Sequence, residues 1–278
     1  MIPEPPWRVA LVTRILPVAL GFYEGLREAG HRPVALLSVR DPRFGQPELG
    51  RQLADVPVDL EVLFPARRSS LAPLLRAVEA DLVVCMGFPW KVPQEALDAV
   101  PLGWLNGHPS LLPRHRGPTP LAWVIRDGDS ETGISFHRMD AELDTGPVLA
   151  QRRYAVGEPC EPEQFYARST PETAAAFVEA LERLAADEDG EPQVGEGTYE
   201  SFFGDEDVEL DLTRSALEVH RLVWAWRYAF TLGPRRGALL ELDGEIVRVL
   251  ASSLTEVEGA RRIECADAPL WLVRTEPA

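Results

Sequence analysis

The sequence predicts an α/β protein, with a Rossmann-like, mostly parallel sheet that carries helices on both faces and a small C-terminal module that contains β-strands. Three observations support this prediction. Short apolar runs alternate with helical patterns at the start of the chain, an acidic, Gly-containing segment with the composition of a linker follows at residues 187–197, and new helix and strand patterns begin near Val208. Alternating strands and helices are typical of parallel sheets covered by helices. We therefore expect one domain over residues 1–200 and a second module over residues 208–278.

The elements of the first domain follow from apolar periodicity. Continuous apolar runs at residues 8–13, 33–39 and 81–86 predict buried strands, and a helical pattern over residues 20–29 ends at Gly30. The other expected elements are a helix through Ala80 capped by Ser69 or Ser70, a helix at 93–99, a strand at 103–108, a helix at 120–126, strands at 132–138 and 148–156, and a helix at 162–186 that Thr170 and Pro171 could divide.

The C-terminal module is expected to begin with a helix and continue as a hairpin. Apolar residues recur at three- and four-residue spacing over residues 213–228, with Thr213 as a candidate cap. Apolar runs at 238–242 and 246–250 flank Asp243-Gly244, a dipeptide typical of tight hairpin turns.

Composition and charge exclude several classes of protein. No run of eighteen apolar residues predicts a membrane-spanning helix, and the N-terminus lacks the basic region of a secretory signal. Three widely spaced cysteines, at 85, 160 and 265, predict neither a disulfide framework nor a metal cluster, so a cytoplasmic location is expected. The formal net charge of −16 disfavours phosphate backbones and anionic membranes as partners, although a local basic patch could override this.

The segment WLNGHPSLLPRHRG, residues 104–117, contains the first candidate functional residues. Asn106 and His108 lie two apart on an expected strand, so their side chains would project from the same face. They would stand near the carboxyl end of a parallel strand, where open α/β sheets bind ligands. A single histidine on a strand is more often structural than functional, so spacing alone leaves both readings open.

The second candidate segment is MDAELDTGP, residues 139–147, between two expected strands. Acidic residues in such loops are often simple turn formers. An acid that orients His108 is also what a general-base or oxyanion arrangement requires, and Asp140 and Asp144 are both available for this.

These two segments together resemble the formyltransferases that use 10-formyltetrahydrofolate. The resemblance rests on HPSLLP, Arg116-Gly117, Met139-Asp140 and Leu143-Asp144-Thr145-Gly146, and it extends over residues 8–151. The family includes methionyl-tRNA formyltransferase, sugar N-formyltransferases and glycinamide ribonucleotide transformylase. A weaker similarity links the segment after Ser215 to the C-terminal module of methionyl-tRNA formyltransferase.

The resemblance implies a catalytic triplet of Asn106, His108 and Asp144. An amine attacks the formyl carbon, and the carbonyl oxygen becomes an oxyanion that accepts hydrogen bonds from the Asn106 amide and from protonated His108. Asp144 favours the imidazolium and steers the proton that leaves the amine. Losing one such donor typically lowers the rate on the order of a hundredfold. This chemistry needs no metal and no nucleophilic side chain.

The resemblance also implies sites for the folate and the acceptor. The segment MGFPWKVP lies where the family holds the pterin, so Phe88, Trp90 and Val92 are expected to line the slot, closed by the backbone near Met139 and Asp140. Packing of a strand end on its neighbouring helix is the alternative for these residues. Arg14 and Ser110 are the expected contacts of the acceptor substrate. Glu142 departs from the glycine that the family often has at this position.

The acceptor is expected to be a small amine, either an amino-sugar nucleotide or an amino-acid-like metabolite. The turn at residues 13–17 lacks the glycines of a phosphate-binding loop, and the loop at residues 40–51 has three arginines and no lysine where the tRNA enzyme has a basic insertion. Methionyl-tRNA formyltransferase is the alternative, supported by the tail and by arginines at 221, 227, 235 and 236. A 10-formyltetrahydrofolate hydrolase, a non-catalytic folate-binding module and a homo-oligomer also remain open.

Overall fold

The computed structural model describes residues 3–39, 53–159, 161–229 and 237–278, and spatial contacts divide the chain into two compact units. The first unit comprises Met1–Gly117, Gly133–Tyr154 and Ser169–Tyr199, and the second comprises Pro118–Thr132, Ala155–Arg168 and Glu200–Ala278. The loop at 40–51, Cys160 and the arginines at 235 and 236 lie outside the described residues. The expected division into residues 1–200 and 208–278 stays a prediction.

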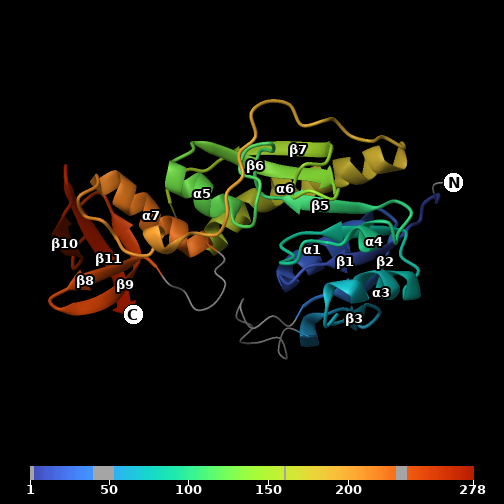
Figure 1. The fold of residues 1–278 in the computed structure, drawn as a ribbon, viewed down its shortest axis with the longest axis horizontal. Helices are drawn as coiled ribbons and strands as arrows, with labels where there is room; N and C mark the ends of the chain where they lie inside the picture. Colours follow the sequence, from blue (N-terminus) through green and yellow to red (C-terminus); the bar gives the residue numbers. More distant parts are fainter. Residues whose placement is uncertain (1–2, 40–52, 160, 230–236) are drawn as a thin grey trace. The chain divides into compact units, whose positions relative to one another are not determined.

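A seven-stranded sheet forms the framework of the first unit (Figure 1). Its strand order is β3-β2-β1-β4-β5-β6-β7. The pairs β1–β2, β1–β4, β2–β3 and β4–β5 are parallel, whereas β5–β6 is antiparallel. The mostly parallel sheet is therefore confirmed, with an antiparallel strand beside β5. The strands are β1 (Arg8–Val12), β2 (Arg32–Leu37), β3 (Glu61–Leu63), β4 (Leu82–Cys85), β5 (Trp104–His108), β6 (Glu131–Arg138) and β7 (Val148–Ala155).

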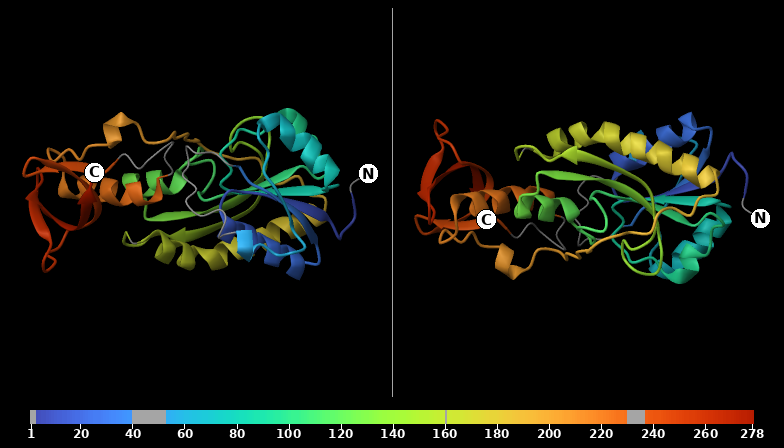
Figure 2. Two further views of the ribbon diagram at one scale, coloured as in Figure 1. Left: turned by 90° about the horizontal axis from the view of Figure 1, so that it is seen from below. Right: turned by 90° about the horizontal axis from the view of Figure 1, so that it is seen from above.

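Helices cover both faces of this sheet, because alternate residues of each strand point to opposite sides. On β1, Val9 and Leu11 pack into a core with α1 (Leu16–Glu28) and with the residues of α6 (Pro162–Ala185) between Ala176 and Leu184. Ala10 and Val12 pack into a second core, with α3 (Leu71–Ala77) and α4 (Gln94–Leu97). Figure 2 shows α1 and α6 on the side of the sheet opposite to α3 and α4.

Several helices differ from the sequence-based expectation. The helix α3 ends at Ala77 instead of Ala80, and the Ser70 side chain makes no capping hydrogen bond. The helix α1 begins at Leu16 instead of residue 20, because Pro17 is tolerated in a first turn, where no amide hydrogen is needed. The helix α6 runs unbroken through Pro171. Short 3-10 turns at Leu53–Asp55, Arg68–Ser70 and Asp205–Asp207 complete the local structure.

In the described residues, the second unit contains the helices α5 and α7, the first residues of α6 and a four-stranded sheet. The helix α5 (Pro120–Asp127) lies against α7 (Ala216–Tyr228), whose capping residue is Ser215 instead of Thr213. Ser215 Oγ accepts from the Glu218 amide at 3.3 Å, and the Glu218 carboxylate accepts from the Ser215 amide at 3.0 Å, which is a capping box. The sheet has the order β10-β11-β9-β8, with β8 (Leu239–Leu242), β9 (Glu245–Ser253), β10 (Arg261–Glu264) and β11 (Pro269–Pro277).

Phe136 on β6 offers a test of the first core. Its side chain is fully buried, and its ring lies 5.4 Å from that of Phe177 and 6.0 Å from that of Phe22. We expect Phe136→Ala to lower the free energy of unfolding by about 3–5 kcal/mol, because the cavity left behind cannot fully collapse. Urea unfolding would measure this. Val178→Ala, at an exposed position of α6, should change the stability by no more than about 0.5 kcal/mol.

Candidate active site

The candidate site lies at the carboxyl ends of the central parallel strands. Strand order reverses between β1 and β4, since β2 and β3 lie on one side of β1 and β4 and β5 on the other. Ligands of open α/β sheets bind at such a reversal. The loop after β1 carries Arg14, the loop after β4 carries Phe88 and Trp90, and β5 ends with Asn106 and His108.

Asn106 and His108 occupy alternate positions at the end of β5. Between them, Gly107 faces the core, where an added Cβ would lie 3.0 Å from the ring of Phe136 and 3.4 Å from Met86 Sδ. His108 is 5% exposed and Asn106 is half-buried. The strand thus presents both side chains on the face opposite to this close backbone contact.

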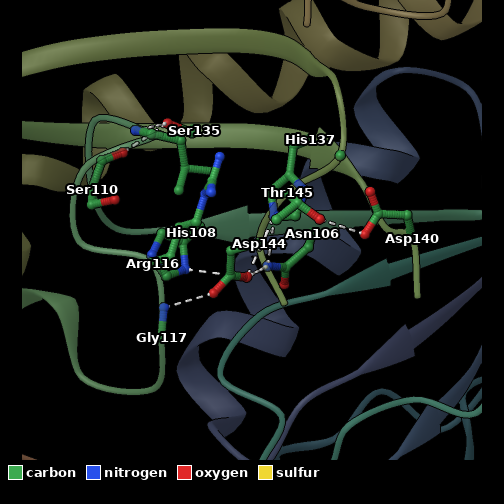
Figure 3. A network of polar contacts seen from close by, with 12 residues as sticks. Asn106, His108, Ser110, Arg116, Gly117, Ser135, His137, Asp140, Asp144 and Thr145 are labelled. Carbon is green, nitrogen blue, oxygen red and sulfur yellow. Dashed lines mark hydrogen bonds and ion pairs between the residues drawn. The ribbon is translucent and has the colours of Figure 1, made fainter. Parts of the chain in front are cut away.

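Three side-chain nitrogens converge on one oxygen of Asp144 (Figure 3). Asp144 Oδ1 lies 3.4 Å from Asn106 Nδ2, 3.6 Å from His108 Nδ1 and 3.6 Å from His137 Nε2. The other oxygen, Oδ2, accepts a hydrogen bond from the Gly117 amide at 2.9 Å. The structure therefore brings the sequence-predicted triplet together and adds a second histidine to it.

His137 lies on β6 and forms two hydrogen-bonded contacts. Its Nδ1 donates to the carbonyl of Arg138 at 2.8 Å. The neutral ring then offers Nε2 as an acceptor, and Asn106 Nδ2 lies 3.1 Å from it. Because β5 and β6 pair with Asn106 opposite His137, this contact follows from the register of the two strands. His137 thereby orients the amide group of Asn106.

The tautomer of His108 is fixed by a backbone carbonyl. Nε2 lies 2.8 Å from the carbonyl oxygen of His115, which can only accept, so Nε2 carries the proton. Burial lowers the pKa of His108, while the charge of Asp144 and the bond to His115 oppose that shift. The neutral ring therefore presents an unprotonated Nδ1 to Asp144, where a proton taken up would form an ion pair.

Asp144 remains ionised in this environment. Burial raises the pKa of the carboxyl group, but the charge that His108 carries when it is protonated, the contact with His137 and the Gly117 amide outweigh burial and leave the pKa below its ordinary value. The backbone of Asp144 has a φ of 57°, a left-handed conformation that Asp and Asn tolerate better than most residues.

The two pKa shifts predict a loss of stability in acid. His108 has a folded pKa below its ordinary 6.5, so the unfolded state binds more protons and stability falls as the pH drops below about 6.5. Asp144 adds to the loss below its ordinary 3.8, as the pH approaches its lowered folded pKa. Burial also lowers the pKa of His31 and of His220, which contribute with the same sign. Thermal unfolding between pH 7 and 4.5 should show a smaller slope for His108→Gln than for the wild type; equal slopes would contradict the assignment.

The loop at 139–147 is folded around Asp140. Asp140 Oδ1 accepts from the Glu142 amide at 3.0 Å and from Thr145 Oγ1 at 2.8 Å. At Gly146 an added Cβ would lie 1.9 Å from the Arg138 carbonyl oxygen, so only glycine fits there. Glu142 is exposed and lies 3.7 Å from Lys91 Nζ, a surface pair of small energetic weight. Glu142 is thus accommodated without a buried charge.

The acidic segment after α6 does not behave as a free linker, which corrects the sequence-based reading. Residues 188–199, here called the strap, are hydrogen-bonded to the loops of the site. The Glu191 and Val148 backbones exchange two hydrogen bonds of 2.8 Å. The Thr198 hydroxyl accepts from the His115 amide at 2.8 Å, and Gln193 contacts the loop of Asp144. His115 is buried beside these contacts.

The residues expected to bind folate gather beside the second core. Val92 is buried within that core, and Phe88, Trp90 and Met139 pack against it half-buried. The rings of Phe88 and Trp90 lie 5.6 Å apart, edge to face. Asp140 is exposed on the neighbouring loop. Contact of these residues with a pterin stays a prediction.

The two residues expected to bind the acceptor lie in different surroundings. Arg14 is half-buried in the loop after β1. Ser110 is fully buried, and its hydroxyl donates to the carbonyl of Arg114 at 2.7 Å, so it supports the turn that follows β5. Their contact with a substrate stays a prediction.

Two features of the described residues bear on membrane and metal-binding classes of protein. No helix in this part of the chain combines the length and apolar character needed to cross a membrane. Nor do three or more His, Cys, Asp or Glu side chains in the same residues form a group that could hold a metal ion.

Comparison with known proteins gives consistent similarities. A family model described as Formyl transferase matches residues 48–181. A methionyl-tRNA formyltransferase from Prochlorococcus marinus (strain MIT 9313) is 34% identical over 224 residues, which cover 72% of this chain and 65% of that protein. A protein of the same name from Paramagnetospirillum magneticum (strain ATCC 700264 / AMB-1) is 36% identical over 247 residues, covering 85% of this chain and 79% of that protein.

Among solved structures, HypX from Aquifex aeolicus in complex with tetrahydrofolic acid has a TM-score of 0.71. It is 19% identical and covers 97% of this chain and 44% of that one, a similarity that concerns the fold alone. The chain spans 65% or less of the length of the first four relatives that it matches.

Proposed function

Because the chain belongs to the formyl transferase family, we propose that it moves the formyl group of 10-formyltetrahydrofolate onto a primary amine by direct attack of that amine. The observation that supports this most strongly is the convergence of nitrogens from Asn106, His108 and His137 on one oxygen of Asp144. The group combines an amide that can donate to an oxyanion, a histidine nitrogen that can take up a proton, and a carboxylate that can stabilise the resulting imidazolium.

The chemistry can be written with these groups alone. The amine nitrogen bonds to the formyl carbon, and the carbonyl oxygen becomes an oxyanion that accepts from Asn106 Nδ2. The unprotonated Nδ1 of His108 receives the proton that leaves the amine, and ionised Asp144 stabilises the imidazolium at 3.6 Å. When the intermediate collapses, the bond from carbon to N10 of the folate breaks, and N10 takes up the proton that His108 received, which returns His108 to its neutral form. This order of proton transfers differs from the sequence-based expectation, in which His108 is already protonated before the amine attacks.

We propose that the pterin binds beside Phe88, Trp90 and Met139. These side chains are apolar and half-buried at the strand-order reversal, and they pack against the second core. The backbone near Asp140 would supply hydrogen-bonding groups. The folate complex of HypX supports such a ligand on this fold. Val92, which is buried in the second core beside these side chains, stays the remaining expected contact of the pterin.

The acceptor proposed first is methionyl-tRNA. Relatives that cover most of this chain carry the name methionyl-tRNA formyltransferase, and they support this acceptor over the small amine expected from sequence. The small amine stays the second candidate because the formal net charge of −16 opposes binding of the negatively charged backbone of a tRNA. The cytoplasm is the proposed compartment for either acceptor.

A turnover assay at two salt concentrations tests these proposals. The assay offers 10-formyltetrahydrofolate with methionyl-tRNA, with amino-sugar nucleotides, with amino acids, or with no acceptor. A tRNA held by six to ten phosphate contacts would lose about a thousandfold or more in affinity between ~50 and ~200 mM salt. Formylated tRNA with that salt response supports methionyl-tRNA as the acceptor. Transfer to a small amine, with no transfer to the tRNA, supports the small amine instead. Formate release that no acceptor stimulates indicates a hydrolase, and no turnover at all contradicts the proposed function.

A further inference from the structure

The strap is attached to the site loops on both sides of Gln193. Before Gln193, the backbone of Glu191 pairs with that of Val148 at the start of β7. After it, the Thr198 amide donates to the carbonyl of Pro113 at 3.2 Å, and the Thr198 carbonyl accepts from the Arg116 amide at 3.1 Å. These anchors do not involve the side chain of Gln193, so the strap can remain in place when that side chain is changed.

The side chain of Gln193 joins the two loops that hold the carboxylate of Asp144. Its Nε2 donates to the carbonyl oxygens of Asp144 at 2.8 Å and of Gly146 at 2.9 Å. Its Oε1 accepts from Arg116 Nη2 at 2.7 Å and from Arg116 Nε at 3.1 Å. Arg116 is followed by Gly117, whose amide donates to Asp144 Oδ2. A closed ring of hydrogen bonds therefore runs from Asp144 through Gln193 and Arg116 back to Asp144.

We propose that Gln193 is a positioning residue for formyl transfer, which acts by holding the Asp144 loop against the Arg116-Gly117 loop so that the carboxylate faces His108. The proposal rests on the proposed function of the site. Gln193 touches no reacting atom, and its effect passes through Asp144.

The amide group is specifically suited to this position. Two carbonyl oxygens require a donor at one end, and a guanidinium requires an acceptor at the other, so the orientation of the amide is fixed. In Gln193→Glu the side chain keeps its length and can still accept from Arg116, but it faces two carbonyl oxygens with an acceptor. In Gln193→Ala both ends are lost. Gln193→Glu should therefore lose activity as Gln193→Ala does.

The experiment measures kcat, KM and the titration of His108 in the full chain. We expect Gln193→Ala and Gln193→Glu to lower kcat on the order of 10- to 100-fold with little change in KM for the folate, because a small displacement of a catalytic group has effects of this size. Gln94→Ala, an exposed glutamine that bonds only Asp98, is the matched control and should keep wild-type kcat. A wild-type kcat for Gln193→Glu would overturn the proposal.

A double-mutant cycle separates positioning from a general structural role. If Gln193 acts through Asp144, adding Gln193→Ala to Asp144→Asn should lower kcat less than twofold further. A full, additive loss in the double variant would contradict the proposal.

The imidazole titration provides a readout that does not need turnover. The charge of Asp144 raises the pKa of His108, so a displaced carboxylate should move the NMR titration of His108 to lower pH in Gln193→Ala. An unchanged titration overturns the proposal. If the wild type transfers no formyl group, the proposed function fails, and the titration still tests whether Gln193 holds Asp144.

Discussion

The Asp144→Asn variant is expected to lose at least about 100-fold in kcat for formyl transfer, with little change in KM for the folate. The substitution removes the negative charge that stabilises His108 after it takes up the proton, and groups of this kind typically contribute effects of that size. Asn tolerates the left-handed backbone at this position, and its amide oxygen can still accept from Gly117. The loss would therefore report the missing charge and not a distorted loop.

Steady-state kinetics between pH 6 and 9 would measure this effect. Asp98→Asn, an exposed change of the same kind whose carboxylate accepts from Gln94, is the control and should retain wild-type rates. The NMR titration of His108 should also move to lower pH in Asp144→Asn, since the stabilising charge is gone. A kcat within about fivefold of the wild type would show that the carboxylate has no essential part in the reaction.

The second large effect is expected from Gly146→Ala. The added Cβ would lie 1.9 Å from the carbonyl oxygen of Arg138, and a backbone atom of β6 cannot move away as a flexible side chain could. The loop must shift instead, and Asp144 lies two residues earlier in it. Because displacements of about 1 Å at a catalytic group cost roughly 100-fold, we expect a loss of kcat comparable to that of Asp144→Asn.

Gly21→Ala provides the matched substitution. Gly21 lies within α1, and an added Cβ would have no neighbour within 4 Å. Alanine is the better helix former, so this variant should gain up to about 1 kcal/mol in stability and keep its activity. Circular dichroism should show folded protein for both variants. Wild-type kcat in folded Gly146→Ala would contradict the role assigned to the loop.

The sequence was sufficient to predict most of the parallel sheet and the close approach of Asn106, His108 and Asp144. Strands such as β1 and β4 can be predicted because their sequences are largely continuous apolar runs. The shared face of Asn106 and His108 follows from the two-residue period of a strand. Strand β3 has three residues, and β10 is RRIE, with a single buried side chain. Such segments carry no apolar period, because their pairing with a neighbouring strand decides their conformation.

Two parts of the candidate site depend on contacts between segments distant in the chain. His137 reaches Asn106 because β5 and β6 pair antiparallel with these two residues opposite each other. The sequence of neither segment alone indicates this register. Gln193 lies in a stretch whose acidic, Gly-containing composition is typical of a linker, although its side chain makes four hydrogen bonds to site loops. Composition describes the average of a segment, whereas these contacts depend on the side chain of the single residue Gln193.

The strap also determines how far a shortened protein can be trimmed. A chain cut after α6, near residue 187, would keep every strand of the seven-stranded sheet, and by composition this is the natural place to cut. It would nevertheless expose the backbone of Val148, leave the guanidinium of Arg116 without the amide of Gln193, and free the His115 amide from the Thr198 hydroxyl. The shortest fragment that retains the geometry around Asp144 therefore ends no earlier than Tyr199, where the backbone still pairs with Arg116.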